Sequence, residues 1–295
     1  MAVFLDDRYI NTQAIMTEFR PGRFQILPPV VKNLIIINTL LALLQFVLIR
    51  GGIDLSDYLG LHYWRSPLYK PWQLLTHMFM HGSPYDINLT IMHLFSNMFA
   101  LWMFGSILEN LWGAKRFILF YLICGIGAAF CHLAVLGYEF HTFETAFYNY
   151  QQNATLNNFL TFMQQHNLDR YQAFNQFKAY WVSDPSCLPC SSKSIELIGQ
   201  YYSQSINEAT VGASGAVFGI LFAFGYLFPN TLLYIYFLVP IKAKWVVGAY
   251  ALFELYAGVR NSAGDNIAHF AHIGGMLVAF IILKLWNRNV RNKFY

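Results

Sequence analysis

A serine between small residues is the first candidate for chemistry in this chain. Gly212-Ala213-Ser214-Gly215 lies where a loop enters an apolar stretch of helical length. Small neighbours let a substrate backbone approach closely, and the free N–H groups at a helix N-terminus favour a developing oxyanion. Ser214 is therefore a candidate nucleophile. The alternative is helix packing, because Gly215 and Gly219 form a pair of small residues that lets two membrane helices touch.

A histidine motif near the C-terminus supplies candidate bases. Ala268 to Gly275 reads AHFAHIGG, so His269 and His272 open an apolar stretch. A serine hydroxyl is a poor nucleophile until a base takes its proton, and a neutral imidazole can take it. Small residues recur along this stretch and permit close helix contact, so Ser214 and His272 can come within hydrogen-bond reach. A buried, hydrogen-bonded structural histidine is the alternative.

A third motif places His93 and Asn97 four residues apart in another apolar stretch. Residues at this spacing share one helix face. Side-chain donors on one face suit an oxyanion hole. Interhelical hydrogen bonding, worth roughly 0.6–2 kcal/mol each, is the simpler interpretation of the same pair.

The elements that must position these residues are membrane helices. The chain is 56% hydrophobic and 12% charged, against about 25% charged in ordinary soluble domains. Stretches of about the length that crosses a bilayer core carry no charge; they are 33–49, 87–108, 117–138, 209–241 and 266–283. Pro229 divides the fourth stretch, because proline breaks helices, into a helix over 214–228 and a semi-polar connector. A further helix follows over 245–259. The prediction is an all-α polytopic membrane protein with six transmembrane helices.

The basic residues orient this bundle. With both termini on one side, most of the 19 Lys and Arg residues fall on that side, which predicts cytoplasmic termini. The net charge of +4 then reflects topology and gives no reason to expect a nucleic-acid partner. The polar N-terminus does not resemble a signal peptide. We expect a cytoplasmic tail over 1–30 and a membrane domain over 31–295, and the compact size favours a bacterial inner membrane.

A long extracytoplasmic insert is predicted over about 139–208, as two or three short helices broken at Asp184-Pro185. Its Cys187 and Cys190 form a CxxC pair, for which a disulfide is plausible in an oxidising compartment. Neither a zinc site nor a thioredoxin-like context accompanies the pair in the sequence. The function of the insert is open.

In their order along the chain, the motifs of His93 and Asn97, of Ser214 and of His272 resemble those of the rhomboid family of intramembrane serine proteases. The resemblance covers about residues 30–290 apart from the insert. The resemblance implies that Ser214 is the nucleophile and His272 the base. It implies that His93 and Asn97 support the oxyanion together with backbone N–H groups near Gly212. Pro71 to Thr76 and His81 resemble the family's membrane-dipping first loop, and Glu109 with Trp112-Gly113 resembles its second-loop signature.

Some residues depart from the family pattern or fall outside it. Gln73 follows Trp72 where the family often has arginine, which questions the usual anchoring of the first loop. Phe218 lies one turn after Ser214, where an aromatic ring beside the imidazole suits the family. His269 is a rival base that does not match the motif.

Glu254 is an ionisable residue inside a predicted span, which is functional by default. A structural pairing with a loop hydroxyl or N–H is the expectation for it. No aspartate is evident to orient the imidazole, so we expect a Ser-His dyad whose ring is fixed by aromatic packing.

The leading hypothesis is therefore an intramembrane serine endopeptidase that cuts single-span membrane proteins within the lipid bilayer, without cofactor or metal. A catalytically inactive relative that binds transmembrane clients is the alternative. A transporter or channel needs paired broken helices and charges along a path, and only Glu254 qualifies. The sequence has no HExxH zinc motif and no GxGD aspartyl motif.

Overall fold

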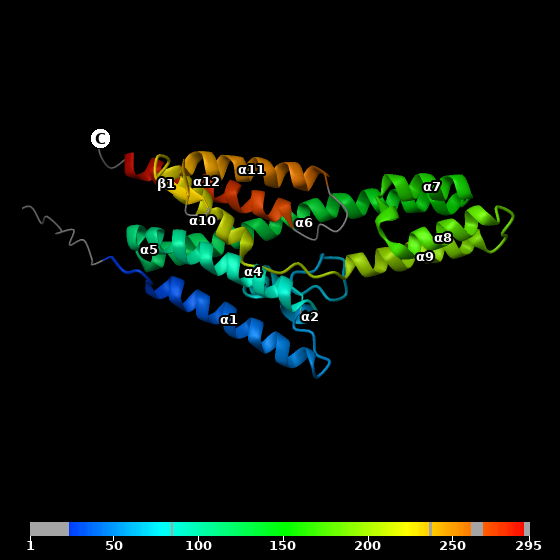
Figure 1. Ribbon diagram of the computed structural model, residues 1–295, viewed down its shortest axis with the longest axis horizontal. Helices are drawn as coiled ribbons and strands as arrows, with labels where there is room; N and C mark the ends of the chain where they lie inside the picture. The colour runs from blue at the N-terminus through cyan, green and yellow to red at the C-terminus, as the bar shows by residue number, and fades with distance from the viewer. Residues whose placement is uncertain (1–23, 84, 236–237, 261–267, 292–295) are drawn as a thin grey trace, which may run out of the picture.

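The computed structural model describes residues 24–83, 85–235, 238–260 and 268–291 (Figure 1). Of the predicted tail over 1–30, residues 1–23 lie outside the described residues. The elements in chain order are α1 (Pro29–Ile49), α2 (Ser56–Leu59), α3 (Gln73–Thr76), the 3₁₀ turn η1 (His77–Phe79), α4 (Ile87–Ala100), the π-helical η2 (Leu101–Gly105), α5 (Ser106–Trp112), α6 (Ala114–Gln152), α7 (Leu156–Gln165), the 3₁₀ turn η3 (Leu168–Arg170), α8 (Gln172–Ser183), α9 (Cys190–Ile206), α10 (Ser214–Leu227), β1 (Leu232–Ile235), β2 (Val239–Lys242), α11 (Ala243–Arg260) and α12 (His269–Arg291).

Helices long and apolar enough to cross a membrane dominate the fold. Among the described residues there are 4, namely α1, the continuous run Ile87–Trp112, α6 and α12. The other two helices predicted to cross are α10, with 14 residues, and α11, with 18. Large apolar side chains on α1, such as Leu40 and Val47, are exposed. Such a continuous apolar face on a helix of this length is typical of contact with lipid. The protein is an integral membrane protein.

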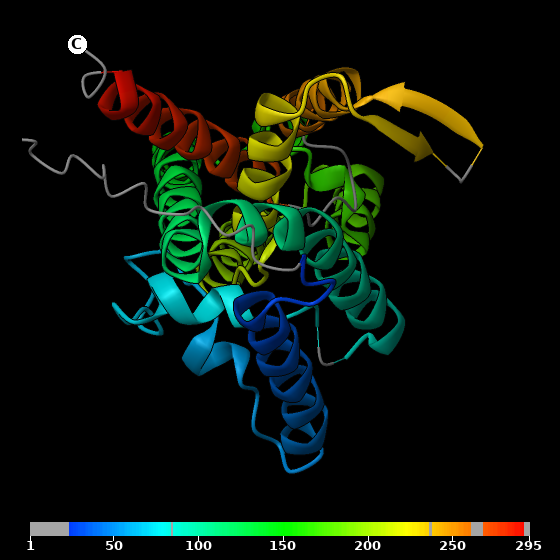
Figure 2. The same cartoon turned by 90° about the vertical axis from the view of Figure 1, so that its left-hand side faces the viewer.

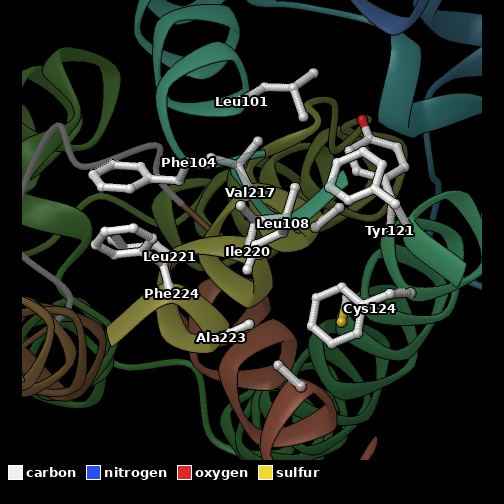
Figure 3. Close-up of a cluster of buried hydrophobic side chains, with 14 of the residues drawn as sticks. Leu101, Phe104, Leu108, Tyr121, Cys124, Val217, Ile220, Leu221, Ala223 and Phe224 are labelled. Carbon is white, nitrogen blue, oxygen red and sulfur yellow. The ribbon is translucent and has the colours of Figure 1, made fainter. Parts of the chain in front are cut away.

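Helix α10 lies at the centre of the bundle. It is apolar on every side, and a helix of this kind is buried. Most of its side chains are buried, and α12 and α6 are its main neighbours. Figure 3 shows the part of this core where α10 meets η2, α5 and α6. The labelled members of this cluster are Leu101, Phe104, Leu108, Tyr121, Cys124, Val217, Ile220, Leu221, Ala223 and Phe224. The start of α10 at Ser214 matches the prediction from the sequence.

The insert is built differently from the prediction at its start. Helix α6 does not end near residue 138 but continues to Gln152, because Phe143 and Tyr150 keep an apolar face buried along it. That face packs on α7, α8 and α9, which share a core that includes Phe159 and Trp181. The predicted break is confirmed, since α8 ends at Ser183 and α9 begins at Cys190. The disulfide between Cys187 and Cys190 is confirmed as well.

A small antiparallel hairpin joins α10 to α11. Strands β1 and β2 pair from Leu232 opposite Lys242 to Ile235 opposite Val239. The prediction had only a semi-polar connector here, so the fold is all-α except for this hairpin. The apolar run of β1 is short enough to be a strand, and periodicity alone does not reveal that. Figure 2 shows the hairpin projecting away from the helices.

The two ends of the described chain lie at the same end of the helices, opposite the insert (Figure 1). Helices α10 and α12 begin on the side that faces the insert. Glu109 fixes the start of α1, because its two carboxylate oxygens accept the N–H groups of Val30 and Val31 at 2.9 and 2.8 Å. A carboxylate at a helix N-terminus also complements the helix dipole.

Candidate active site

Ser214 is held by the segment that precedes it. Thr210 pairs with Leu61 of the first loop through two backbone hydrogen bonds of 2.8 Å. Two residues further along the chain, the N–H of Gly212 donates to the carbonyl of His77 at 2.9 Å. Helix α10 then begins at Ser214. The first loop therefore fixes the backbone directly ahead of the serine, and the first turn of the helix leaves N–H groups without intrahelical partners beside its hydroxyl.

Gly212 brings His93 and Ser214 together. Its φ of 135° is a conformation that side chains disfavour. A Cβ at this position would lie 2.9 Å from His93 Cε1, 3.0 Å from His93 Nε2 and 3.5 Å from Ser214 Oγ. The imidazole of His93 and the hydroxyl of Ser214 thus both border the same glycine.

The tautomer of His93 follows from its other contact. The Gly82 N–H donates to His93 Nδ1 at 3.3 Å. A neutral ring that accepts at Nδ1 carries its proton on Nε2. The Nε2–H therefore lies on the side of Gly212, where it can serve as an oxyanion donor. His81 packs edge-on against this ring at 5.3 Å, and burial lowers the pKa of His81 to about 3, so that neighbour is uncharged at neutral pH.

Asn97 lies on the same face of α4 as predicted. It is 5% exposed, and its Nδ2 donates to the carbonyl of His93 at 2.9 Å. Within the described part of the chain no hydrogen bond joins Asn97 to Ser214. An amide nitrogen carries two hydrogens, so one N–H of Asn97 remains for a bound oxyanion.

The ring of His272 is fixed on two sides. It stacks on Phe218 with a centroid separation of 4.0 Å and an interplanar angle of 8°. This confirms the predicted aromatic support. Its Nδ1 lies 2.8 Å from Glu254 Oε2. A carboxylate accepts, so Nδ1 donates and the lone pair of a neutral ring lies on Nε2. That is the tautomer a general base needs.

Helices α10 and α12 touch through glycine. A Cβ on Gly275 would lie 1.9 Å from the carbonyl oxygen of Gly215, the residue after Ser214. One turn later, Gly219 faces the carbonyl of Gly275, with 3.1 Å from its ideal Cβ to that oxygen. The predicted contact between small faces is confirmed. No hydrogen bond joins Ser214 to His272 among the described residues, and catalytic hydrogen bonds are often long before substrate binds.

Glu254 corrects two expectations from the sequence. It was expected to pair with a loop hydroxyl or N–H, and the imidazole was expected to have no carboxylate partner. Instead Glu254 Oε2 lies 2.6 Å from His269 Nδ1 as well as 2.8 Å from His272 Nδ1. The three residues lie on α11 and α12, and no motif spacing links them. His269, the rival base, is 6% exposed.

Gln73 replaces the arginine of the family pattern as the anchor of the first loop. It is fully buried. Its Oε1 accepts the N–H groups of His62 and Lys70 at 3.3 and 3.1 Å, and its Nε2 donates to the carbonyl of Leu68 at 3.0 Å. A neutral amide satisfies the loop backbone here without burying a charge, so the loop keeps its anchor despite the departure.

Comparison with known proteins identifies the family. The model of the rhomboid domain matches residues 69–142 and 188–288, more than half of the chain. The gap in the match falls within the insert, and the matched segments contain each of the three motifs. No curated protein sequence matches the chain closely enough to add a relative. With the match on either side of the insert, the chain belongs to the rhomboid family.

Proposed function

We propose that the protein is an intramembrane serine endopeptidase that hydrolyses peptide bonds in or next to transmembrane helices. The observation that carries this proposal is the contact of α10 and α12 at Gly215 and Gly275. This contact joins the helix that begins with Ser214 to the helix that holds His272. Membership of the rhomboid family supports the same function.

In the proposed reaction, Ser214 Oγ attacks the scissile carbonyl while His272 Nε2 takes its proton. The oxyanion is held by the Nε2–H of His93, the remaining N–H of Asn97 and the backbone N–H of Ser214. The N–H of Gly212, expected from the sequence to help, is instead bonded to the carbonyl of His77. His272 then gives its proton to the leaving amine. Water attacks the acyl-enzyme with His272 again as base, which releases the second product and restores the serine.

In this proposal six helices cross the membrane. They are the helices that are long and apolar enough on their own, together with α10 and α11. Exposed apolar residues along α11, such as Leu252 and Val259, support its contact with lipid. Both termini are then cytoplasmic and the insert extracytoplasmic, in a bacterial inner membrane. The substrate is a single-span membrane protein whose helix unwinds locally near the outer surface. Metal, cofactor and nucleic acid have no part in this reaction.

Labelling with a serine-reactive fluorophosphonate tests the nucleophile without knowledge of the substrate. Purified protein in detergent is expected to carry the label on Ser214, and Ser214→Ala and His272→Ala are expected to lose it. Ser183→Ala, which removes a hydroxyl in the insert at the end of α8, is the matched control and should label like wild type. A folded wild-type protein that takes no label at Ser214 would favour the inactive, client-binding relative.

A further inference from the structure

The carboxylate of Glu254 is buried inside the membrane domain. Glu254 is 3% exposed and lies within α11, one of the helices proposed to cross the membrane. A charged side chain at such a position is costly unless its partners compensate. Its Oε2 is shared by the Nδ1 atoms of His269 and His272, which are 6% and 7% exposed. The carboxylate is thus held by two imidazoles, one of which is the proposed base.

The distances within this cluster decide between a metal site and a hydrogen-bonded one. A carboxylate and two imidazoles are ligand types that bind zinc, and their ligand atoms lie within 4.8 Å of one another. Around a tetrahedral ion with bonds of about 2.0–2.1 Å, ligand atoms stand about 3.3 Å apart. The observed 2.6 and 2.8 Å are instead the lengths of charge-assisted N–H···O hydrogen bonds. Both rings therefore donate to the carboxylate.

We propose that Glu254 is the positioning residue of His272, so that the site is a Ser-His-Glu triad, with His269 as the second donor that holds the carboxylate in place. This inference rests on the proposed function. The carboxylate fixes the tautomer of His272 that carries its lone pair on Nε2. This nitrogen is the one that takes the proton of Ser214. The carboxylate also stabilises the imidazolium that forms during each proton transfer.

The arrangement also separates the two histidines, although both bond to the same oxygen. His272 stacks on Phe218, and its ring therefore lies against the helix that carries Ser214. The ring of His269 is turned away from that of His272 by 85°, at a centroid distance of 6.3 Å. His269 is therefore the hydrogen-bond donor that holds the carboxylate, and His272 is the base for Ser214.

The first variant for the test is Glu254→Gln, which keeps size and removes charge. Its amide can donate to Nδ1 of His272, which moves the ring proton to Nε2 and blocks the base. The rate of fluorophosphonate labelling at Ser214 should fall about 10²- to 10⁴-fold at its plateau. Tyr256→Phe removes a hydroxyl from the exposed side of the same helix and should label at the wild-type rate.

The pH profile gives a readout that a purely structural role would not move. A carboxylate beside an imidazole favours the protonated ring, so wild type should lose labelling at a higher pH than Glu254→Gln does. The variant is expected to combine a lower plateau with an acidic limb at lower pH. The other titratable side chains that act on this cluster are the same in both proteins, so their titration cancels in the comparison; they are His93 from α4, His132 from α6 and Tyr250 from α11.

A second variant keeps the inference testable if Glu254→Gln does not give a monodisperse, cooperatively unfolding protein. In His269→Gln the Glu254 carboxylate keeps its hydrogen bond to His272, and the imidazole of His269 no longer competes for the same oxygen. Labelling should stay within about tenfold of wild type. The loss of labelling towards acidic pH should begin at a higher pH than in wild type, because the Glu254 carboxylate then favours protonation of the His272 ring alone. The proposal would be overturned if His269→Gln loses labelling at the same pH as wild type or at a lower pH.

The outcomes separate this inference from the proposed function. Wild type that takes no label at Ser214 refutes the protease itself and the triad with it. Wild type that labels, beside a Glu254→Gln variant with the same plateau and the same acidic limb, refutes only the role of Glu254. Labelling that is lost on adding a chelator and restored by Zn²⁺ would also overturn the proposal, because the cluster would then be a metal site.

Discussion

The substitution Gly275→Ala adds one methyl group at the contact of α10 and α12. The new Cβ would stand 1.9 Å from the carbonyl oxygen of Gly215, whereas ordinary contacts begin at 3.4 Å. The obstacle is backbone, so no side chain can turn aside to make room. The two helices must separate or slide by about 1.5 Å, which is the difference between those two distances. Ser214 adjoins the displaced carbonyl.

The size of the effect follows from that displacement. A misplacement of about 1 Å between reacting groups costs about 10²-fold in rate. We therefore expect fluorophosphonate labelling of Ser214 in Gly275→Ala to fall by about 10²-fold or more. Overpacking of this kind also destabilises by about 1–3 kcal/mol, so the thermal unfolding midpoint in detergent should drop while the protein still folds.

Gly248→Ala is the matched control for this substitution. Gly248 is also a helical glycine, on α11, but among the described residues no atom outside its own stretch of helix lies within 4 Å of the position its Cβ would take. Alanine there should leave labelling unchanged and raise stability by about 0.5–1 kcal/mol through helix propensity. Wild-type labelling by a folded Gly275→Ala variant would refute the close helix contact, and with it the argument that this contact aligns serine and histidine.

Three further predictions probe the surroundings of the site. Gly212→Ala, which forces a Cβ to 2.9 Å from His93 at a φ of 135°, should cut labelling at least about tenfold; equal labelling would contradict the disposition of that imidazole. Phe218→Leu removes the ring stacked on His272, and an aromatic pair worth about 0.5–1.5 kcal/mol predicts a loss in kcat of up to about tenfold; the check is reporter cleavage at saturating substrate, with an unaltered kcat as the contrary result. Burial lowers the pKa of His77 to about 4, so the unfolded chain takes up a proton first, near pH 6.5. Stability is then complete above about pH 6.5 and declines, by up to an amount on the order of 3 kcal/mol, as the pH falls towards about 4; unfolding midpoints across this range should depend less on pH in His77→Gln, and identical slopes would exclude the histidine as the cause.

Much of the membrane architecture could be predicted from composition and spacing. Uncharged stretches of membrane length located the main helices, and Pro229 marked the end of α10 correctly. The continuation of α6 to Gln152 was missed, because charge content marks where lipid contact ends and not where a helix ends. Helix α6 leaves the apolar stretch and keeps its backbone hydrogen bonds by packing on the helices of the insert.

The candidate site was predictable where motifs carry it and not where packing does. The motifs singled out Ser214, His93 and Gly212, and these three residues lie side by side in the structure. Glu254 was singled out as an ionisable residue in a span, but its partners lie 15 and 18 residues away on another helix. Only the rotation of α11 against α12 decides which face meets the histidines, and the hydrophobic pattern of α11 does not reveal that rotation.

The most direct test of the account is cleavage of a single-span membrane reporter by the purified protein in liposomes, beside Ser214→Ala and His272→Ala. We predict that wild type cuts the reporter in or next to its transmembrane segment. Both variants should retain the wild-type unfolding midpoint to within a few degrees and lose cleavage. Cleavage that persists in folded Ser214→Ala would contradict the account, because a nucleophile other than this serine would then do the chemistry.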